Sequence, residues 1–206
     1  MTVEFIKNNV SRETNKGEIK MSATNRSNVR KSYDFYSTPI ECIKTLLNNI
    51  DLSVYGNDVL EPSAGNGNIC KVFKEYYPNK ELTAVELREE EYNNLCQLNI
   101  DDVIIDSYYN IRYEFDIIIG NPPYSEAQEF IEHSFELLNE NGILIFLLRT
   151  NFLESKKRYE FWKKNPLSKL YTLSKRPSFT GKGTDATSYS WFIWDNSSNV
   201  QEIKVI

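Results

Sequence analysis

The tetrapeptide Asn121-Pro122-Pro123-Tyr124 holds the residue types best suited to chemistry in this sequence of 206 residues. Two consecutive prolines fix the backbone and keep the Pro122 carbonyl out of a helical hydrogen-bond ladder. The Asn121 side chain places a second carbonyl beside it, and Tyr124 adds a flat surface. Two fixed acceptors can bind both N–H groups of a planar amino group on an aromatic base, which localises the nitrogen lone pair towards an electrophilic methyl group. The tetrapeptide therefore predicts methylation of such an amino nitrogen.

A covalent route through cysteine is not expected. Methylation at a base carbon would require a cysteine nucleophile, and none of Cys42, Cys70 and Cys96 follows a proline or ends a predicted strand facing this loop. Their spacing also excludes a C-x-x-C pair, so neither a disulfide framework nor a metal site is expected. The compartment expected for such a chain is the reducing cytoplasm.

A second candidate site is the turn at residues 61–67. Gly65 and Gly67 permit a tight turn with the backbone close to a ligand, at a helix N-terminus that favours an anion. Cys70 stands where a dinucleotide fingerprint has its third glycine, and Glu61 would repel a pyrophosphate. An ammonium group suits that carboxylate, and S-adenosyl-L-methionine combines an ammonium, a carboxylate and a sulfonium.

Two more acids follow predicted strands. Glu86 lies 19 residues past Gly67, where its carboxylate could accept hydrogen bonds from both ribose hydroxyls of a cofactor. Asp106 ends the next strand and could accept from an adenine amino group. One such acid would ordinarily be a solvated loop carboxylate, but acids at three successive strand ends indicate a single ligand site.

Strands and helices alternate around these residues. Thr38 is the expected N-cap of the first helix, and Asn141-Gly142 the expected end of the fourth. The segments 103–105 and 115–119 are apolar enough to be buried on both faces. We expect strands at 58–61, 81–86, 103–105, 115–119, 143–148, 170–175 and 188–194, and helices at 38–49, 67–77, 89–98, 126–140 and 155–164. This order predicts an open, doubly wound α/β sheet whose ligands bind beyond the carboxyl ends of the strands.

Charge is distributed unevenly over the chain, whose net charge is −5. Residues 1–32 carry seven basic and three acidic side chains, residues 33–148 six and 21, and residues 149–182 ten and two. The two basic segments favour a polyanion-binding face, although an unevenly charged solvated surface has the same composition. Residues 1–32 show no apolar period and are predicted to form a flexible basic arm before one domain at 33–206. The longest apolar run has six residues, against the roughly 20 that a membrane span needs, so no membrane partner is expected.

In this order and spacing, the motifs resemble the class I S-adenosylmethionine-dependent methyltransferases, specifically the N6-adenine DNA methyltransferases with an Asn/Asp-Pro-Pro-Tyr/Phe motif. The resemblance extends over about residues 33–195 and includes the segments 34–39, 59–67, 85–87 and 115–124. It implies a Rossmann-like, mostly parallel sheet of seven strands with a C-terminal antiparallel hairpin, S-adenosyl-L-methionine as cofactor and DNA as substrate. The cofactor-binding residues that it implies are Tyr36, Thr38, Glu61, Pro62, Ser63, Ala64, Gly65, Gly67, Glu86, Leu87, Asp106, Ser107 and Asn121.

The same resemblance assigns roles towards the target. Asn121 and Pro122 would bind the target amino group, and Tyr124 would stack on a base extruded from the duplex. The family also places an aromatic residue before its last hairpin strand, where this chain has Phe179; a residue that plugs the hairpin loop onto the core fits that position nearly as well. The basic residues expected to contact phosphates are Arg149, Lys156, Lys157, Arg158, Lys163, Lys164, Lys175, Arg176 and Lys182.

Target recognition is the weakest part of the resemblance. Tyr124 runs almost directly into the next predicted helix, and only 12 residues follow Trp194, so no room is expected for a separate recognition domain. Low or short-context specificity is expected, or recognition supplied by a partner subunit or a homodimer. The open alternatives are adenine in RNA, a glutamine amide in protein, and a non-catalytic nucleic-acid-binding subunit with the same fold.

Overall fold

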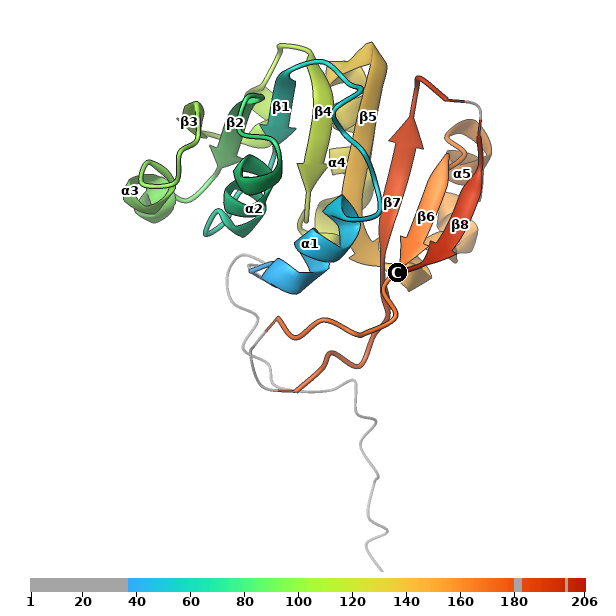
Figure 1. Ribbon diagram of the computed structural model, residues 1–206. Helices are drawn as coiled ribbons and strands as arrows, with labels where there is room; N and C mark the ends of the chain where they lie inside the picture. Colours follow the sequence, from blue (N-terminus) through green and yellow to red (C-terminus); the bar gives the residue numbers. More distant parts are fainter. Residues whose placement is uncertain (1–36, 180–182, 199) are drawn as a thin grey trace, which may run out of the picture. The chain divides into compact units, whose positions relative to one another are not determined.

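One mixed sheet of eight strands organises the molecule (Figure 1). The computed structural model describes residues 37–179, 183–198 and 200–206, so the predictions for the arm at 1–32, for Tyr36 and for Lys182 lie outside the described residues. The strand order is β3-β2-β1-β4-β5-β7-β6-β8. The strands are β1 (Asp58–Glu61), β2 (Glu81–Glu86), β3 (Asp102–Ile105), β4 (Phe115–Gly120), β5 (Leu138–Arg149), β6 (Lys169–Thr172), β7 (Tyr189–Asp195) and β8 (Glu202–Val205).

The strand directions confirm the doubly wound prediction. Strands β1 to β5 run parallel, whereas β7 runs antiparallel to both β5 and β6. The expected count of seven strands is wrong, because β8 adds an eighth strand parallel to β6 at the edge. Its apolar side chains Ile203 and Val205 are exposed, while Glu202 accepts a hydrogen bond from the Tyr171 hydroxyl. Backbone pairing and this polar contact hold β8, so no buried apolar pattern marks it in the sequence.

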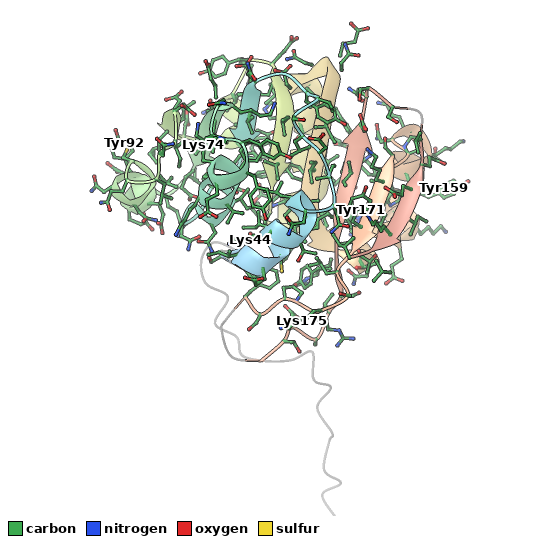
Figure 2. All side chains as sticks on the ribbon, in the orientation of Figure 1. Lys44, Lys74, Tyr92, Tyr159, Tyr171 and Lys175 are labelled. Atoms are coloured by element: carbon green, nitrogen blue, oxygen red, sulfur yellow. The ribbon has the colours of Figure 1, made fainter. Side chains whose placement is uncertain are left out.

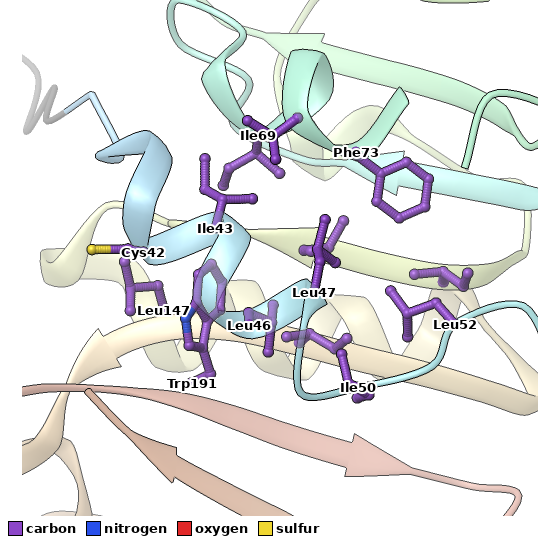
Figure 3. Packing of buried hydrophobic residues seen from close by; sticks show 14 of the residues in the cluster. Cys42, Ile43, Leu46, Leu47, Ile50, Leu52, Ile69, Phe73, Leu147 and Trp191 are labelled. Atoms are coloured by element: carbon purple, nitrogen blue, oxygen red, sulfur yellow. The ribbon is translucent and has the colours of Figure 1, made fainter. Parts of the chain in front are cut away.

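Helices cover both faces of the sheet, with α1 and α2 in front and α4 and α5 behind it in Figure 1. On one face, α1 (Ile40–Leu47) presents Ile43, Leu46 and Leu47 to the core, and Figure 3 shows them beside Trp191 of β7. The other helices are α2 (Asn68–Tyr76), α3 (Tyr92–Leu95), α4 (Ala127–Leu137) and α5 (Tyr159–Lys164). Burial of each leucine or isoleucine side chain contributes about 1.5–3 kcal/mol to the free energy of unfolding. This packing therefore fixes α1 and the residues that precede it.

Several helices are shorter than their apolar patterns predict. Residues 89–91 and 156–158 are 3-10 turns that lead into the short α3 and α5. Helix α1 begins at Ile40 with Pro39 at the N-cap position, so the expectation that Thr38 caps it is wrong. The Thr38 hydroxyl instead accepts a hydrogen bond from Asn121, and this tertiary contact replaces the local cap.

The expected end of the fourth helix at Asn141-Gly142 is also wrong. Helix α4 ends at Leu137, because Leu138 already pairs with Phe115 of β4. Regular pairing resumes at Ile117 and Ile143, so β5 has an irregularity between these two pairs. Asn139 lies in it and donates its side-chain amide to Asp116 Oδ1 at 2.7 Å. Residues that local capping rules assign to the helix therefore pair in the sheet instead.

The position of each strand decides its burial and its distance from the site. Strand β4 is buried as predicted, but β3 is only partly buried because it forms the edge of the sheet. Strands β1 and β4 are neighbours, with Leu60 opposite Ile118. This is the point where strand order reverses, so the loops after β1 and β4 lie side by side.

Among the described residues, no helix is long and apolar enough to cross a membrane.

Candidate active site

The turn after β1 needs glycine at two positions. Gly65 and Gly67 have φ values of 57° and 78°, in the left-handed region that favours glycine. A Cβ on Gly67 would also clash with the side chain of Leu98. The backbone N–H of Ala64 donates to the Val85 carbonyl of β2 at 2.9 Å. The turn is thus tied to the neighbouring strand and leads into the N-terminus of α2.

Glu86 holds this turn from the end of β2. Its Oε2 accepts the Gly65 N–H at 2.7 Å, and its Oε1 accepts the backbone N–H and the Nε–H of Arg88 at 3.0 and 2.8 Å. A carboxylate offers about four acceptor positions, so one more hydrogen bond fits this side chain without displacing a partner. The next residue, Leu87, exposes its side chain to solvent.

Glu61 is a buried acid at the start of the turn, with 1% of its surface exposed. Its Oε2 accepts a hydrogen bond from the Cys70 thiol at 3.1 Å. Burial raises the pKa of Glu61 well above its ordinary value, the Cys70 hydrogen bond opposes that rise, and the charge of Glu86 adds to it. A cation placed beside Glu61 would stabilise the ionised form. A buried acid above two left-handed glycines fits an ammonium-bearing ligand held against the backbone.

Asp106 lies at the exposed end of β3. Its Oδ1 accepts the Ser107 backbone N–H at 2.6 Å and the Asn110 side-chain amide at 2.9 Å. These two bonds fix the orientation of the carboxylate. A depression of about 550 Å³ borders this end of β3 and is lined by Glu89, Tyr92, Asn93 and Ile105. The structure thus places Asp106 and Ser107 beside an open recess next to β2.

The loop after β4 is attached to the turn after β1. The Ser63 hydroxyl donates to the Asn121 carbonyl at 3.3 Å. A Cβ on Gly120 would lie 3.1 Å from Pro62 Cδ, so the two loops are pressed together at this glycine. Asn121 is also held through its side chain, whose Nδ2 donates to Thr38 Oγ1 at 3.1 Å. The structure therefore brings Thr38, the turn after β1 and the loop after β4 together.

Three polar residues that the sequence prediction omitted complete this attachment. The Ser37 hydroxyl donates to Asn66 Oδ1 at 3.0 Å, and Asn68 Nδ2 donates to Ser37 Oγ and to the Thr38 carbonyl at 2.9 and 2.8 Å. They join the segment before α1 to the turn after β1. The alternation of glycine and asparagine at residues 65–68 is the signal that could have indicated Asn66 and Asn68, since asparagines in and beside turns commonly form hydrogen bonds with nearby groups.

An aromatic cluster flanks the loop after β4. The Tyr189 ring centre lies 5.8 Å from that of Tyr124 and 5.0 Å from that of Phe179. The Arg149 guanidinium carbon lies 4.9 Å from the centre of the Tyr124 ring, and the Tyr189 hydroxyl donates to Asp185 at 3.0 Å. Burial raises the pKa of Tyr124, and the nearby Tyr189 adds to the rise. Tyr124 and Phe179 thus share a cluster centred on Tyr189, which the sequence prediction missed.

Phe179 packs partly buried against the main core cluster as well. Both alternatives raised for this residue, a surface for the target and a plug of the hairpin loop, are therefore compatible with its contacts.

The basic residues after β5 differ in their surroundings. Lys156 and Lys157 are exposed, and so are Arg176 and its neighbour Lys175, which Figure 2 shows in the loop between β6 and β7. Arg158 donates to the carbonyls of Phe152 and Glu154 at 3.1 and 2.8 Å. Its guanidinium is therefore engaged in holding the turn before α5.

His133 lies on α4 (Ala127–Leu137) against two tyrosines. Its ring centre lies 4.8 Å from that of Tyr108 and 5.7 Å from that of Tyr109. These contacts are those of a packing residue on α4.

Comparison with known proteins places this site in a family. Residues 41–179 match the family described as Methyltransferase small domain, which is more than half of the chain. The chain belongs to that family. This methyltransferase also has the fold of class I enzymes: it superposes on a proposed class I S-adenosylmethionine-dependent methyltransferase from Listeria monocytogenes with a TM-score of 0.60 and 16% identity, over 82% of this chain and 65% of that one. The cofactor expected from the sequence, S-adenosyl-L-methionine, is confirmed by family and fold together.

Three other similar proteins bear different names. The Modification methylase CviBIII of Paramecium bursaria Chlorella virus NC1A is 29% identical, over 45% of this chain and 31% of that protein. A proposed RNA methyltransferase from Pyrococcus horikoshii superposes with a TM-score of 0.62 at 17% identity, over 80% of this chain and 86% of that one. The M protein of the type I restriction enzyme EcoKI gives a TM-score of 0.59 at 15% identity, over 80% and 45% of the two chains. The methyltransferase thus spans less than a third of its curated relative.

Proposed function

We propose that this methyltransferase transfers a methyl group to the exocyclic N6 amino group of adenine in DNA. One observation carries the proposal. Asn121 follows β4 directly and is attached through its backbone to Ser63 of the cofactor turn and through its side chain to Thr38. An amide fixed in this way beside a cofactor turn suits a planar amino group as the methyl acceptor.

The residues that would hold the cofactor surround the carboxyl ends of β1, β2 and β3. Glu61 would pair with its ammonium group, Glu86 would accept from a ribose hydroxyl, and Asp106 would accept from its adenine amino group. The turn at Gly65 and Gly67 would bring the backbone close to it. S-adenosylmethionine, when bound, supplies an electrophilic methyl group.

The catalytic loop would prepare the acceptor. The Asn121 side-chain oxygen and the Pro122 carbonyl would each accept one N–H of the adenine amino group. Both acceptors favour a nitrogen that moves towards tetrahedral geometry, so its lone pair is withdrawn from the ring and becomes nucleophilic. Tyr124 and Phe179 would contact the faces of the extruded base, which needs such surfaces once it leaves the stack.

DNA is the preferred substrate because two lines of support coincide. The partly matching relative is named a modification methylase, and the exposed Lys156, Lys157, Lys175 and Arg176 supply positive charge after β5 and in the loop between β6 and β7. Tyr124 leads within three residues into α4, so no recognition domain is inserted there. We propose low or short-context specificity, with further recognition supplied by a partner subunit or a second copy of the chain.

Methyl transfer from labelled cofactor to separate DNA, RNA and protein pools tests this proposal. The expected result is label in DNA that digestion identifies as N6-methyladenine. Label confined to RNA would show that RNA is the substrate instead. A protein of similar fold from Pyrococcus horikoshii is named as an RNA methyltransferase. Label confined to protein would overturn the nucleic-acid proposal. If calorimetry detects no binding of S-adenosylmethionine, the result would instead support a non-catalytic nucleic-acid-binding subunit with the same fold.

A further inference from the structure

Thr38 is fixed at both its backbone and its side chain. Its carbonyl accepts from Asn68 Nδ2 at 2.8 Å, and its hydroxyl oxygen accepts from Asn121 Nδ2 at 3.1 Å. Only 5% of the residue is exposed. The following helix, α1, is anchored in the core by Ile43 and Leu46, so Thr38 occupies one rigid position beside the catalytic loop.

The contact between Thr38 and Asn121 bears on the direction of the amide. A carboxamide has one acceptor oxygen and one donor NH₂ on opposite sides. When the hydroxyl oxygen of Thr38 accepts from that NH₂, the amide oxygen of Asn121 is turned away from Thr38. That oxygen is the only acceptor atom in the Asn121 side chain, and the proposed chemistry needs it directed at the target.

The cofactor turn is attached to the same segment. Ser37 bonds Asn66, and Asn68 bonds both Ser37 and Thr38. Asn66 lies between Gly65 and Gly67, whose left-handed backbone forms the turn. The segment 37–38 therefore contacts the cofactor turn and the catalytic amide at once, and it fixes the position of one relative to the other.

We propose that Thr38 is a positioning residue that orients the Asn121 carboxamide for methyl transfer, beyond the cofactor contact that the family resemblance assigns to it. This inference rests on the proposed function, in which Asn121 binds the target amino group. It makes Thr38 act through Asn121, with Asn68 and Ser37 holding Thr38 in place.

Two substitutions at Thr38 and one matched control test the kinetic consequence. Thr38→Val keeps the side-chain shape and removes the hydroxyl, whereas Thr38→Ser keeps the hydroxyl. Thr45→Val makes the same change on α1, where the hydroxyl donates to the Glu41 carbonyl. We expect Thr38→Val to lower the single-turnover transfer rate about tenfold or more at saturating cofactor, a condition under which a weaker cofactor contact of Thr38 alone would not lower the rate. Thr38→Ser should restore most of the rate, and Thr45→Val should leave it unchanged. Undiminished transfer by Thr38→Val, or a loss explained entirely by a weaker cofactor Kd, would overturn the inference.

A second readout does not depend on the substrate. In protein labelled with ¹⁵N-asparagine, the Asn121 side-chain NH₂ signals can be assigned by their loss in Asn121→Asp. Thr38→Val should shift these signals and speed their hydrogen exchange, whereas Thr38→Ser should not. Unchanged signals in a folded Thr38→Val protein would contradict the positioning contact. If Thr38→Val shifts these signals but the wild-type protein methylates no nucleic acid, the contact is retained and the proposed function is rejected instead.

Discussion

The guanidinium carbon of Arg149 lies 4.9 Å from the centre of the Tyr124 ring. Arg149 ends β5 and Tyr124 follows β4, and these two strands are neighbours in the sheet. The same ring also contacts Tyr189 of β7, the strand on the other side of β5. Residues from β5 and β7 thus contact the aromatic side chain of the loop after β4. A cation over a partly buried tyrosine stabilises that arrangement by about 0.5–2 kcal/mol.

Replacing Arg149 by methionine should lower kcat/KM for methyl transfer, beyond the small loss of unfolding free energy that it causes. Lys204→Met is the control, because Lys204, on the edge strand β8 of the sheet, lies 5.5 Å from the centre of the Tyr171 ring. Each change should cost about 1 kcal/mol of unfolding free energy, measured by denaturant titration. Only Arg149→Met should also lower kcat/KM for the nucleic acid, and Arg149→Lys should lie between it and the wild type. Equal losses of kcat/KM in the two methionine variants would contradict a local role for Arg149.

Cofactor binding should become tighter as pH rises, because Glu61 must be ionised to pair with an ammonium group. Burial raises the pKa of Glu61 well above its ordinary value of 4.5, so the free protein holds a proton that binding must release. The association constant should therefore increase with pH above the ordinary titration range of a carboxyl group, while the α-amino group of the ligand stays protonated. Calorimetry in buffers of different ionisation enthalpy measures the released proton.

Glu61→Gln supplies the control for that experiment. It cannot ionise, so its weaker binding should show little dependence on pH over the same range. A wild-type affinity that is flat with pH, with no proton release, would show that Glu61 does not pair with the ammonium group.

The sequence and the structure agree where local pattern determines structure. Short apolar runs predict the bounds of β1 and β2. The tight turn after β1 explains why residues 65 and 67 are glycines. The contacts that assemble the site depend instead on residues far apart in the chain: Asn121 and Thr38 are 83 positions apart, and Ser37 and Asn66 are 29. No helical or strand period encodes such pairs.

The errors have the same origin. Thr38 has the side chain of a good N-cap, yet its hydroxyl contacts Asn121, and the helix begins one residue beyond Pro39. The Asn141-Gly142 pair resembles a helix end, yet the chain pairs with β4 in the sheet from Leu138 onwards. Tyr189 resembles any other buried strand residue in the sequence, and only the approach of the loop after β4 and the loop between β6 and β7 makes it the centre of the aromatic cluster. In each case a tertiary contact overrides a local preference.

Neutralising Glu86 should weaken cofactor binding more than neutralising Asp106. Glu86 is 7% exposed and accepts three hydrogen bonds, whereas Asp106 is exposed to solvent. Hydrogen bonds to a charged partner contribute about 1.5–3 kcal/mol when shielded from water, so Glu86→Gln should raise the cofactor Kd about tenfold to a hundredfold. Asp106→Asn should raise it severalfold at most. The reverse order, measured by calorimetry on folded variants, would exclude Glu86 as the main ribose acceptor.

Reversing the charge of Lys156 and Lys157 should weaken DNA binding in a salt-dependent way. Both side chains are exposed, and neither forms an ion pair among the described residues. Each lysine that contacts a phosphate contributes about 0.9 to the slope of log K against log salt, so the double glutamate variant should lose nearly two from that slope. Lys71→Glu on α2 is the control and should change neither affinity nor slope. An unchanged slope in the double variant would remove these lysines from the interface.

Substituting Asn121 by alanine should abolish methyl transfer while cofactor affinity changes little. The amide would supply one of the two acceptors for the target amino group, and preorganised contacts of this kind contribute about 10²–10³ in rate when one is removed. Asn121→Asp keeps an acceptor oxygen and should retain part of the activity. Single-turnover rates with saturating cofactor, together with calorimetric Kd values, separate the two effects. Transfer by Asn121→Ala at a rate near that of the wild type would show that the acceptor is activated by groups other than this amide.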